Sequence, residues 1–150
     1  GDVYKRQMLN AQKSIDRQVQ LMTHYRSPNY DDINISKKHL GNIKFTFPSY
    51  FLEKKDSILI KFESNYSNKF GKNPNRISIK GYDLTMDVAL RIAIADNFLD
   101  AINLGESEYL LHNFNYSKKH DNSFGNYSSF LVQHQQDTIV EIVPRKLHLK

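Results

Sequence analysis

The chain has 150 residues, with 21 Lys and Arg against 16 Asp and Glu, a formal charge of +5, 39% hydrophobic residues and no cysteine. A chain of this length forms one domain or part of a larger one. No apolar run approaches the roughly 18 residues of a spanning helix, so we expect no membrane span. Without cysteine, the sequence excludes disulfides, thiolate nucleophiles and cysteine-bound metals.

The positive charge is spread along the chain. Lysines occur in separated pairs (37–38, 54–55 and 118–119), without a long block of like charges. This spacing favours a solvated surface over a nucleic-acid-binding stripe, so we expect no nucleic-acid partner.

The two ends of the chain differ from its middle. Residues 1–7, GDVYKRQ, resemble translated adapter sequence at the edge of environmental sequencing contigs; a native extended lead-in is the alternative. The sequence opens without methionine or the features of a signal peptide. We expect residues 8–143 to be the C-terminal portion of a domain that is incomplete at its N-terminal side, and residues 144–150 to be a tail.

The first elements are short. Residues 8–18 predict a frayed helix and residues 19–22 a short buried strand. The turn-forming residues of HYRSPNYDD, which follow, predict a loop. One helical turn is expected within residues 33–40.

A half-buried strand follows that turn. Ile43, Phe45 and Phe47 alternate with polar residues, which is the period-two pattern of such a strand. Pro48 is expected to end it, because proline has no N–H to donate to a ladder.

Apolar residues then recur every four positions from Ile58 to Phe70, with charged residues between them. This period predicts an amphipathic helix over residues 57–70. Asp56 or Ser57 can cap its first turn and Gly71 its last. A break at residues 73–75 and a short extended segment at residues 77–79 are expected next.

A second helix is predicted from Leu84. Apolar residues cover most of its circumference to residue 99 and leave Asp87 and Arg91 as an i, i+4 pair on a narrow polar strip. Such a helix must be buried between other elements. Asp83 is placed to cap its first turn, and Gly81 to act as a pivot before it.

The last third has β character after a short helix at residues 100–104. Phe114 and Tyr116 alternate with polar residues, a polar turn follows, and residues 127–134 and 138–143 read as the strands of a terminal β-hairpin. The order of helices and strands predicts an α/β fold.

The sequence carries no specific catalytic or metal-binding pattern. The six histidines are widely spaced without the H-x-x-x-H interval of a zinc helix, and no nucleophile elbow, P-loop or dinucleotide-binding glycine motif is present. Asp31 and Asp32 lack the glycine and glutamate of a calcium loop, so a turn is the default interpretation. We therefore expect a protein that is not an enzyme, with no cofactor and no metal.

Residues 61–93, KFESNYSNKFGKNPNRISIKGYDLTMDVALRIA, resemble a stretch of the type I periplasmic solute-binding proteins of the branched-chain amino acid type. In that family a helix ending in an aromatic-x-x-Lys-Phe-Gly phrase precedes a proline-containing loop and a Gly-Tyr-Asp that opens a long buried helix. Flanking segments (VQLMTHYRSPNYDD, IKFTFPSY, residues 105–116 and FLVQHQQDTIVEIV) resemble the branch joined to lysin-motif (LysM) peptidoglycan-binding repeats. The resemblance covers roughly residues 8–143.

The resemblance implies two α/β lobes joined by crossing strands. The chain would contain the last strands of one lobe and two helices of the other. Strands that cross between the lobes would lie near residues 48–52 and 114–117. Gly81, Tyr82 and Asp83 would have structural roles and no contact with a ligand. The helix from Leu84 would expose apolar surface in this fragment and make it poorly folded or prone to associate.

Ligands of open α/β sheets bind beyond the carboxyl ends of strands. The candidate ligand-binding residues follow the first two predicted strands: His24, Tyr25, Arg26, Ser49 and Tyr50. A tyrosine could stack on a small ligand and Arg26 could bind a carboxylate through two hydrogen bonds. The alternative is that each is an exposed loop or hinge residue.

Two functions remain open. The chain could belong to a solute-binding module of the periplasm or cell envelope that binds an amino acid or cell-wall fragment by hinge closure. Alternatively, it could be a structural or interaction domain of a peptidoglycan-associated envelope protein with a degenerate cleft. The segment HYRSPNY departs from the glycine-rich loop of transporter members, which leaves backbone amides free for an amino acid's carboxylate, and so counts against a transported amino acid.

Overall fold

The computed structural model describes residues 7, 11, 20–31, 35–54 and 56–142. The chain divides into two compact units. Unit 1 comprises residues up to Ser49 and from Phe130 onward, and unit 2 comprises Tyr50–Ser129. The helix predicted for residues 8–18 and the tail at residues 144–150 lie outside the described residues, apart from Ala11.

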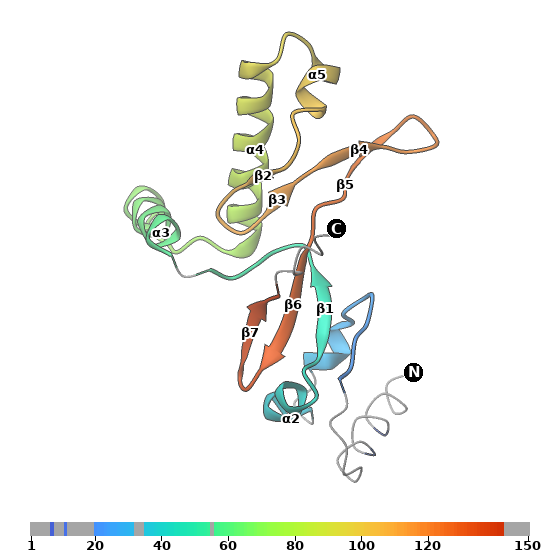
Figure 1. The fold of residues 1–150 in the computed structure, drawn as a ribbon. Coiled ribbons are helices and arrows are strands. Elements are labelled where there is room, and N and C mark those ends of the chain that lie inside the picture. Colours follow the sequence, from blue (N-terminus) through green and yellow to red (C-terminus); the bar gives the residue numbers. More distant parts are fainter. Residues whose placement is uncertain (1–6, 8–10, 12–19, 32–34, 55, 143–150) are drawn as a thin grey trace, which may run out of the picture. The chain divides into compact units, whose positions relative to one another are not determined.

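Unit 1 is built on an antiparallel three-stranded sheet in the order β1-β6-β7 (Figure 1). Its strands are β1 (Thr46–Ser49), β6 (Phe130–Gln135) and β7 (Thr138–Glu141). Thr46 pairs with Gln133, and Gln135 pairs with Thr138 across the turn that joins β6 and β7. The predicted terminal hairpin is confirmed, although β6 begins at Phe130 and not at residue 127.

The core of unit 1 is aromatic. Phe45 is fully buried, and its ring lies 4.6 Å from that of Tyr30 and 5.3 Å from that of Phe47. Leu40, from α2 (Lys37–Asn42), and Val132, from β6, are also buried. The helical turn expected within residues 33–40 forms later, at α2, because the side chain of Ser36 caps it by accepting from the His39 amide. The loop before it contains the 3-10 turn η2 (Pro28–Asp31).

Pro48 does not end the strand. It lies within β1 opposite Leu131. A proline is tolerated there because β1 stands at one end of the β1-β6-β7 order, where a residue whose N–H would point away from β6 needs no ladder partner.

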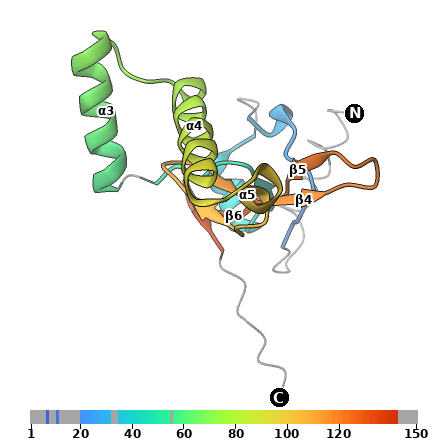
Figure 2. The same ribbon diagram turned by 90° about the horizontal axis from the view of Figure 1, so that it is seen from above.

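Unit 2 begins with two helices, α3 (Ser57–Phe70) and α4 (Arg76–Ile94) (Figure 2). The prediction for α3 is confirmed with both caps: Asp56 accepts from the Leu59 amide, and Gly71 is left-handed with a φ of 68°. The predicted inward stripe is only partly right. Leu59 is the buried residue of α3, while Ile58 is 67% exposed.

The prediction for the second helix was wrong at its start. α4 begins at Arg76, because Asn75 accepts from the Ser78 amide and caps the helix there. The segment at residues 77–79 is therefore helical and not extended. Gly81 lies within the helix, where an added Cβ would meet nothing within 4 Å, so it is neither a pivot nor a site of close approach.

The remaining elements of unit 2 are short. The helix α5 (Phe98–Ile102) lies beside the C-terminal part of α4 (Figure 1, Figure 2). Two short antiparallel pairs follow: β2 (Ser107–Glu108) with β3 (Asn113–Phe114), and β4 (Tyr116–Lys118) with β5 (Phe124–Asn126). The single strand expected around Phe114 and Tyr116 is thus divided between two sheets, and part of the expected polar turn belongs to β5.

A small apolar core holds unit 2 together. Leu59, Ile79, Leu110 and Leu111 are buried in it, with Phe51 and Phe62 packed against them. The chain mixes helices and strands, as the α/β prediction requires. It passes from unit 1 to unit 2 after Ser49, within the crossing expected at residues 48–52, but returns after Ser129 and not near residues 114–117.

Candidate functional site

Two extended segments of unit 1 run parallel to each other. Met22 forms a parallel bridge with Thr46, and three backbone hydrogen bonds flank it: Leu21 N–H to Ile43 O, Thr46 N–H to Leu21 O and Thr23 N–H to Thr46 O, at 2.8–3.0 Å. Of the short buried strand predicted at residues 19–22, the described residues form a single bridge, and the expected burial is wrong, because Met22 is 64% exposed. Because the segments are parallel, the residues that follow them leave the sheet in the same direction. His24, Tyr25, Arg26 and Ser49 therefore belong to the same end of unit 1.

Arg26 is positioned by an aromatic side chain of β1. Its guanidinium carbon lies 5.1 Å from the centre of the Phe47 ring, within the range of a cation–π contact, and the residue is half-buried. A guanidinium group is planar and can donate two hydrogen bonds to a carboxylate. Of the candidate residues, Arg26 has the chemistry and the support that suit an anionic ligand.

The other candidates are more open. Tyr25 is 63% exposed, and its loop is held by Thr23, whose hydroxyl donates to the Tyr25 carbonyl over 2.9 Å. His24 is exposed, and Ser49 is half-buried opposite Phe130. Tyr50 is 75% exposed and is the first residue of unit 2, so the structure does not group it with the other four.

A second polar cluster, in unit 2, was not predicted as such. Asp83, Asp87 and Arg91 are spaced four residues apart and share one face of α4. All three are buried, and both carboxylates have no exposed surface. The polar strip of α4 is therefore its inward face, which corrects the role of Asp83 as a helix cap.

Asp83 fastens the connection between β2 and β3 to α4. Its carboxylate accepts from the backbone amides of Leu110, at 3.2 Å, and Leu111, at 3.0 Å, and lies 2.8 Å from His112 Nδ1. A buried carboxylate requires such donors, since an unpaired charge in the interior is costly. Tyr82 beside it packs its ring 4.6 Å from that of Phe62 and stays 41% exposed.

Asp87 and Arg91 form the second half of the cluster. The predicted pair is confirmed, with Arg91 Nε donating to Asp87 over 2.8 Å. Asp87 also accepts from the hydroxyls of Ser107, at 2.5 Å, and Tyr116, at 2.9 Å. Arg91 donates in addition to the carbonyls of Ala101, Gly105 and Phe114, so one side chain joins α4 to α5 and β3.

This cluster shifts the pKa of two tyrosines upward. Burial and the hydrogen bond to the Asp87 carboxylate raise the pKa of Tyr116 to about 12. Burial and the charge of Asp87 likewise raise the pKa of Tyr109. Both shifts keep the phenols protonated as donors. Both carboxylates are buried, and their oxygens accept hydrogen bonds from donors within unit 2. The cluster therefore stabilises unit 2 and offers no reacting group to a substrate.

The cluster could have been suspected from its spacing. Asp83, Asp87 and Arg91 form a four-residue series, and such a series lies on one face of a helix whether that face is wet or buried. The side-chain donors to its carboxylates lie 20 or 29 residues further along, in Ser107, His112 and Tyr116. No sequence pattern pairs them with the helix.

Neither a metal site nor a membrane span emerges from the part of the chain that the structure describes. Its His, Asp and Glu residues nowhere gather in a group of three that could hold a metal ion. Within the same residues, each helix is too short or too polar to cross a bilayer.

Comparisons with known proteins place the chain in no family: no family matches it, and no curated protein is similar to it. Among solved structures, an ABC transporter substrate-binding protein from Desulfitobacterium hafniense, in complex with Leu, is similar at a TM-score of 0.45 and 15% identity. The match covers 91% of this chain and 39% of that protein. The assignment of a function therefore rests on the chain's own residues.

Proposed function

We propose that the chain is part of a solute-binding-like module of the cell envelope that binds a small polar ligand and has no catalytic activity. The observation that carries this proposal is the parallel pairing of Met22 with Thr46, which gives the loop at residues 24–26 and the end of β1 a common direction. Residues in such positions are where open α/β sheets bind ligands.

The side chains at this end favour a ligand with a carboxylate. Arg26 offers a planar, permanently charged fork, held by its contact with Phe47. Tyr25 offers an exposed ring that can cover an apolar part of the ligand. An amino acid and a peptide fragment of the cell wall both combine these features.

Hinge closure is the proposed mode of binding. The chain passes between its units after Ser49 and again after Ser129, and two such passages can act as a hinge. The candidates Ser49 and Tyr50 flank the first passage. A ligand would favour a closed state only as far as it gains contacts there that the open state lacks.

The alternative is an interaction domain of a peptidoglycan-associated envelope protein whose ligand cleft is degenerate, with lysin-motif repeats elsewhere in the protein. The apolar surface of α4 favours it: Ile92 is 58% exposed and Ile94 71% exposed. Exposed apolar patches commonly mark surfaces that another chain covers.

Isothermal titration calorimetry separates the two functions. The chain is titrated with branched-chain amino acids and, separately, with muropeptides. Under the proposal, one of the two ligand classes gives a binding heat that saturates at a fixed stoichiometry. Arg26→Gln then weakens binding of that ligand by about tenfold or more, as expected for the loss of a charged hydrogen bond. The control Arg76→Gln removes an exposed arginine of unit 2.

Two results would count against solute binding. One is the absence of binding heat with both ligand classes in a chain that unfolds cooperatively. The other is an equal loss of affinity in Arg26→Gln and Arg76→Gln, which would show that overall charge and not the loop at residues 24–26 attracts the ligand. The first result would favour the interaction domain.

A further inference from the structure

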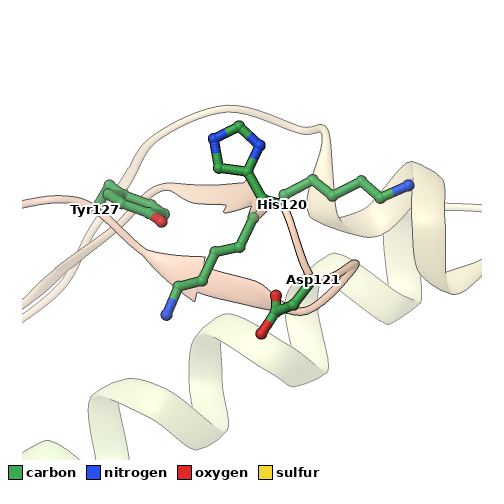
Figure 3. A pocket seen from close by; sticks show the side chains of 5 residues that line it. His120, Asp121 and Tyr127 are labelled. Atoms are coloured by element: carbon green, nitrogen blue, oxygen red, sulfur yellow. The ribbon is translucent and has the colours of Figure 1, made fainter.

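The β4–β5 hairpin of unit 2 carries a hollow of about 520 Å³ that neither proposed function uses. It is lined by Lys118, Lys119, His120, Asp121 and Tyr127. Figure 3 shows Tyr127 at one end of the hollow, with His120 and Asp121 projecting from the loop on opposite sides of the strands. The lining thus combines cationic groups with an aromatic ring.

The acidic residue of the hollow is engaged by its own loop. Asp121 accepts from the backbone amide of Ser123 at 3.0 Å and from its hydroxyl at 2.6 Å. These hydrogen bonds lower the pKa of the Asp121 carboxyl. Among the described residues, no ion pair joins Lys118 or Lys119 to a carboxylate. The lysine charges are therefore available to a ligand.

Lys119 does not simply extend into solvent. Its side chain lies across Gly125 of β5: a Cβ built on that glycine would be 2.8 Å from Lys119 Cε and 3.4 Å from its Nζ. The same Cβ would lie 3.4 Å from the ring of Tyr127. The missing side chain at Gly125 thus leaves room for Lys119 to cross the strand, and Tyr127, which is 58% exposed, borders the same glycine.

We propose that this hollow binds a small organic anion in which a carboxylate or phosphate is joined to a flat apolar group. The ammonium of Lys119 pairs with the anionic group, and the ring of Tyr127 packs against the flat part. Because the lysine already lies over the strand, binding costs less side-chain entropy than it does at an extended surface lysine.

The test uses the full chain, with benzoate and phenyl phosphate as probes and benzyl alcohol as the neutral control. Binding is followed by the amide chemical shifts of Gly125 and Tyr127. Benzoate and phenyl phosphate both contain a phenyl ring, so the ratio of their affinities shows whether the hollow prefers a carboxylate or a phosphate. Lys119→Gln should weaken the better anion by about fivefold, the upper end for one exposed charge contact. Gly125→Ala should also weaken it, because its methyl group displaces Lys119.

The matched control is Lys72→Gln, which removes an exposed lysine from another part of unit 2 and should leave the affinity unchanged. Three results would overturn the proposal. They are shifts at Gly125 that benzyl alcohol reproduces, equal weakening by Lys119→Gln and Lys72→Gln, and the absence of any shift at Gly125 with either anion.

Discussion

Replacing Asp83 by asparagine should destabilise unit 2 strongly, although the two side chains have nearly the same shape. The carboxylate of Asp83 is fully buried and serves three donors: Leu110 N–H on one oxygen, and Leu111 N–H and His112 Nδ1 on the other. An asparagine has one acceptor oxygen, and its second position is an NH2 group.

The magnitude follows from the better of the two amide orientations. With the oxygen toward Leu111 and His112, the NH2 group faces the Leu110 amide, and one buried donor loses its acceptor at a cost of about 1–3 kcal/mol. The two remaining hydrogen bonds lose their charged acceptor and weaken further. We expect unfolding of unit 2 to become easier by about 2–4 kcal/mol in total.

Amide hydrogen exchange measures this effect locally, which matters because a chain of two units need not unfold in one step. The amides of Leu110 and Leu111 should exchange about a hundredfold faster in Asp83→Asn. Asp96→Asn is the control, since Asp96 is exposed, and it should change stability by less than about 0.5 kcal/mol. Equal exchange rates at Leu110 and Leu111 in the two variants would refute the role assigned to the Asp83 carboxylate.

Three further outcomes are expected. In urea denaturation, Gly71→Ala should lower the free energy of unfolding by about 1 kcal/mol, because Gly71 has a positive φ. Gly81→Ala, at an open position inside α4, should raise it by about 0.5–1 kcal/mol. The reverse order of the two effects would contradict the observed helix bounds. Folding raises the pKa of Tyr116 from 10.0 to about 12. The stability that this shift contributes is therefore complete below about pH 10 and is lost as the pH rises through about 12. Thermal melts between these pH values should show a smaller fall in stability with pH for Tyr116→Phe than for the parent chain. Sedimentation velocity should show that the chain self-associates through the exposed apolar side of α4. Ile92→Lys should reduce this association, whereas Asn65→Lys, at an exposed position of α3, should not. A monomeric parent chain would contradict the prediction.

The extent of sequence-based prediction is clearest in α3 and α4. The bounds of α3 follow from neighbours in the chain, since Asp56 and Gly71 satisfy the backbone groups at its two ends. For α4 the sequence predicted Asp83 as the cap and residues 73–75 as a break. The structure places the cap at Asn75, and Asp83 accepts instead from the distant amides of Leu110 and Leu111.

The candidate site shows the same division. The loop at residues 24–26 follows a segment that was predicted as a buried strand and forms a single bridge at Met22. The ligand-binding role of the loop stays a prediction. The structure added the parallel bridge to Thr46 and the contact of Arg26 with Phe47. Tyr50 was grouped with the loop by the strand pattern, but it opens the other unit.

The exposed apolar side of α4 was predicted correctly, and the burial of its polar side was not. An even covering of apolar residues predicts that this fragment exposes apolar surface on α4, and Leu84, Val88 and Ile92 are exposed. That other elements cover this surface in a longer protein stays a prediction. A prediction from hydropathy alone places charged residues in solvent, because hydropathy contains no information about hydrogen-bond donors from distant parts of the chain. The sequence thus determined the position of α3 and of the terminal hairpin, through caps, turns and periodicity. Only the tertiary structure decided which face of α4 lies inside, because three-dimensional folding brings the amides of Leu110 and Leu111 to Asp83 and thereby offsets the cost of burying its charge.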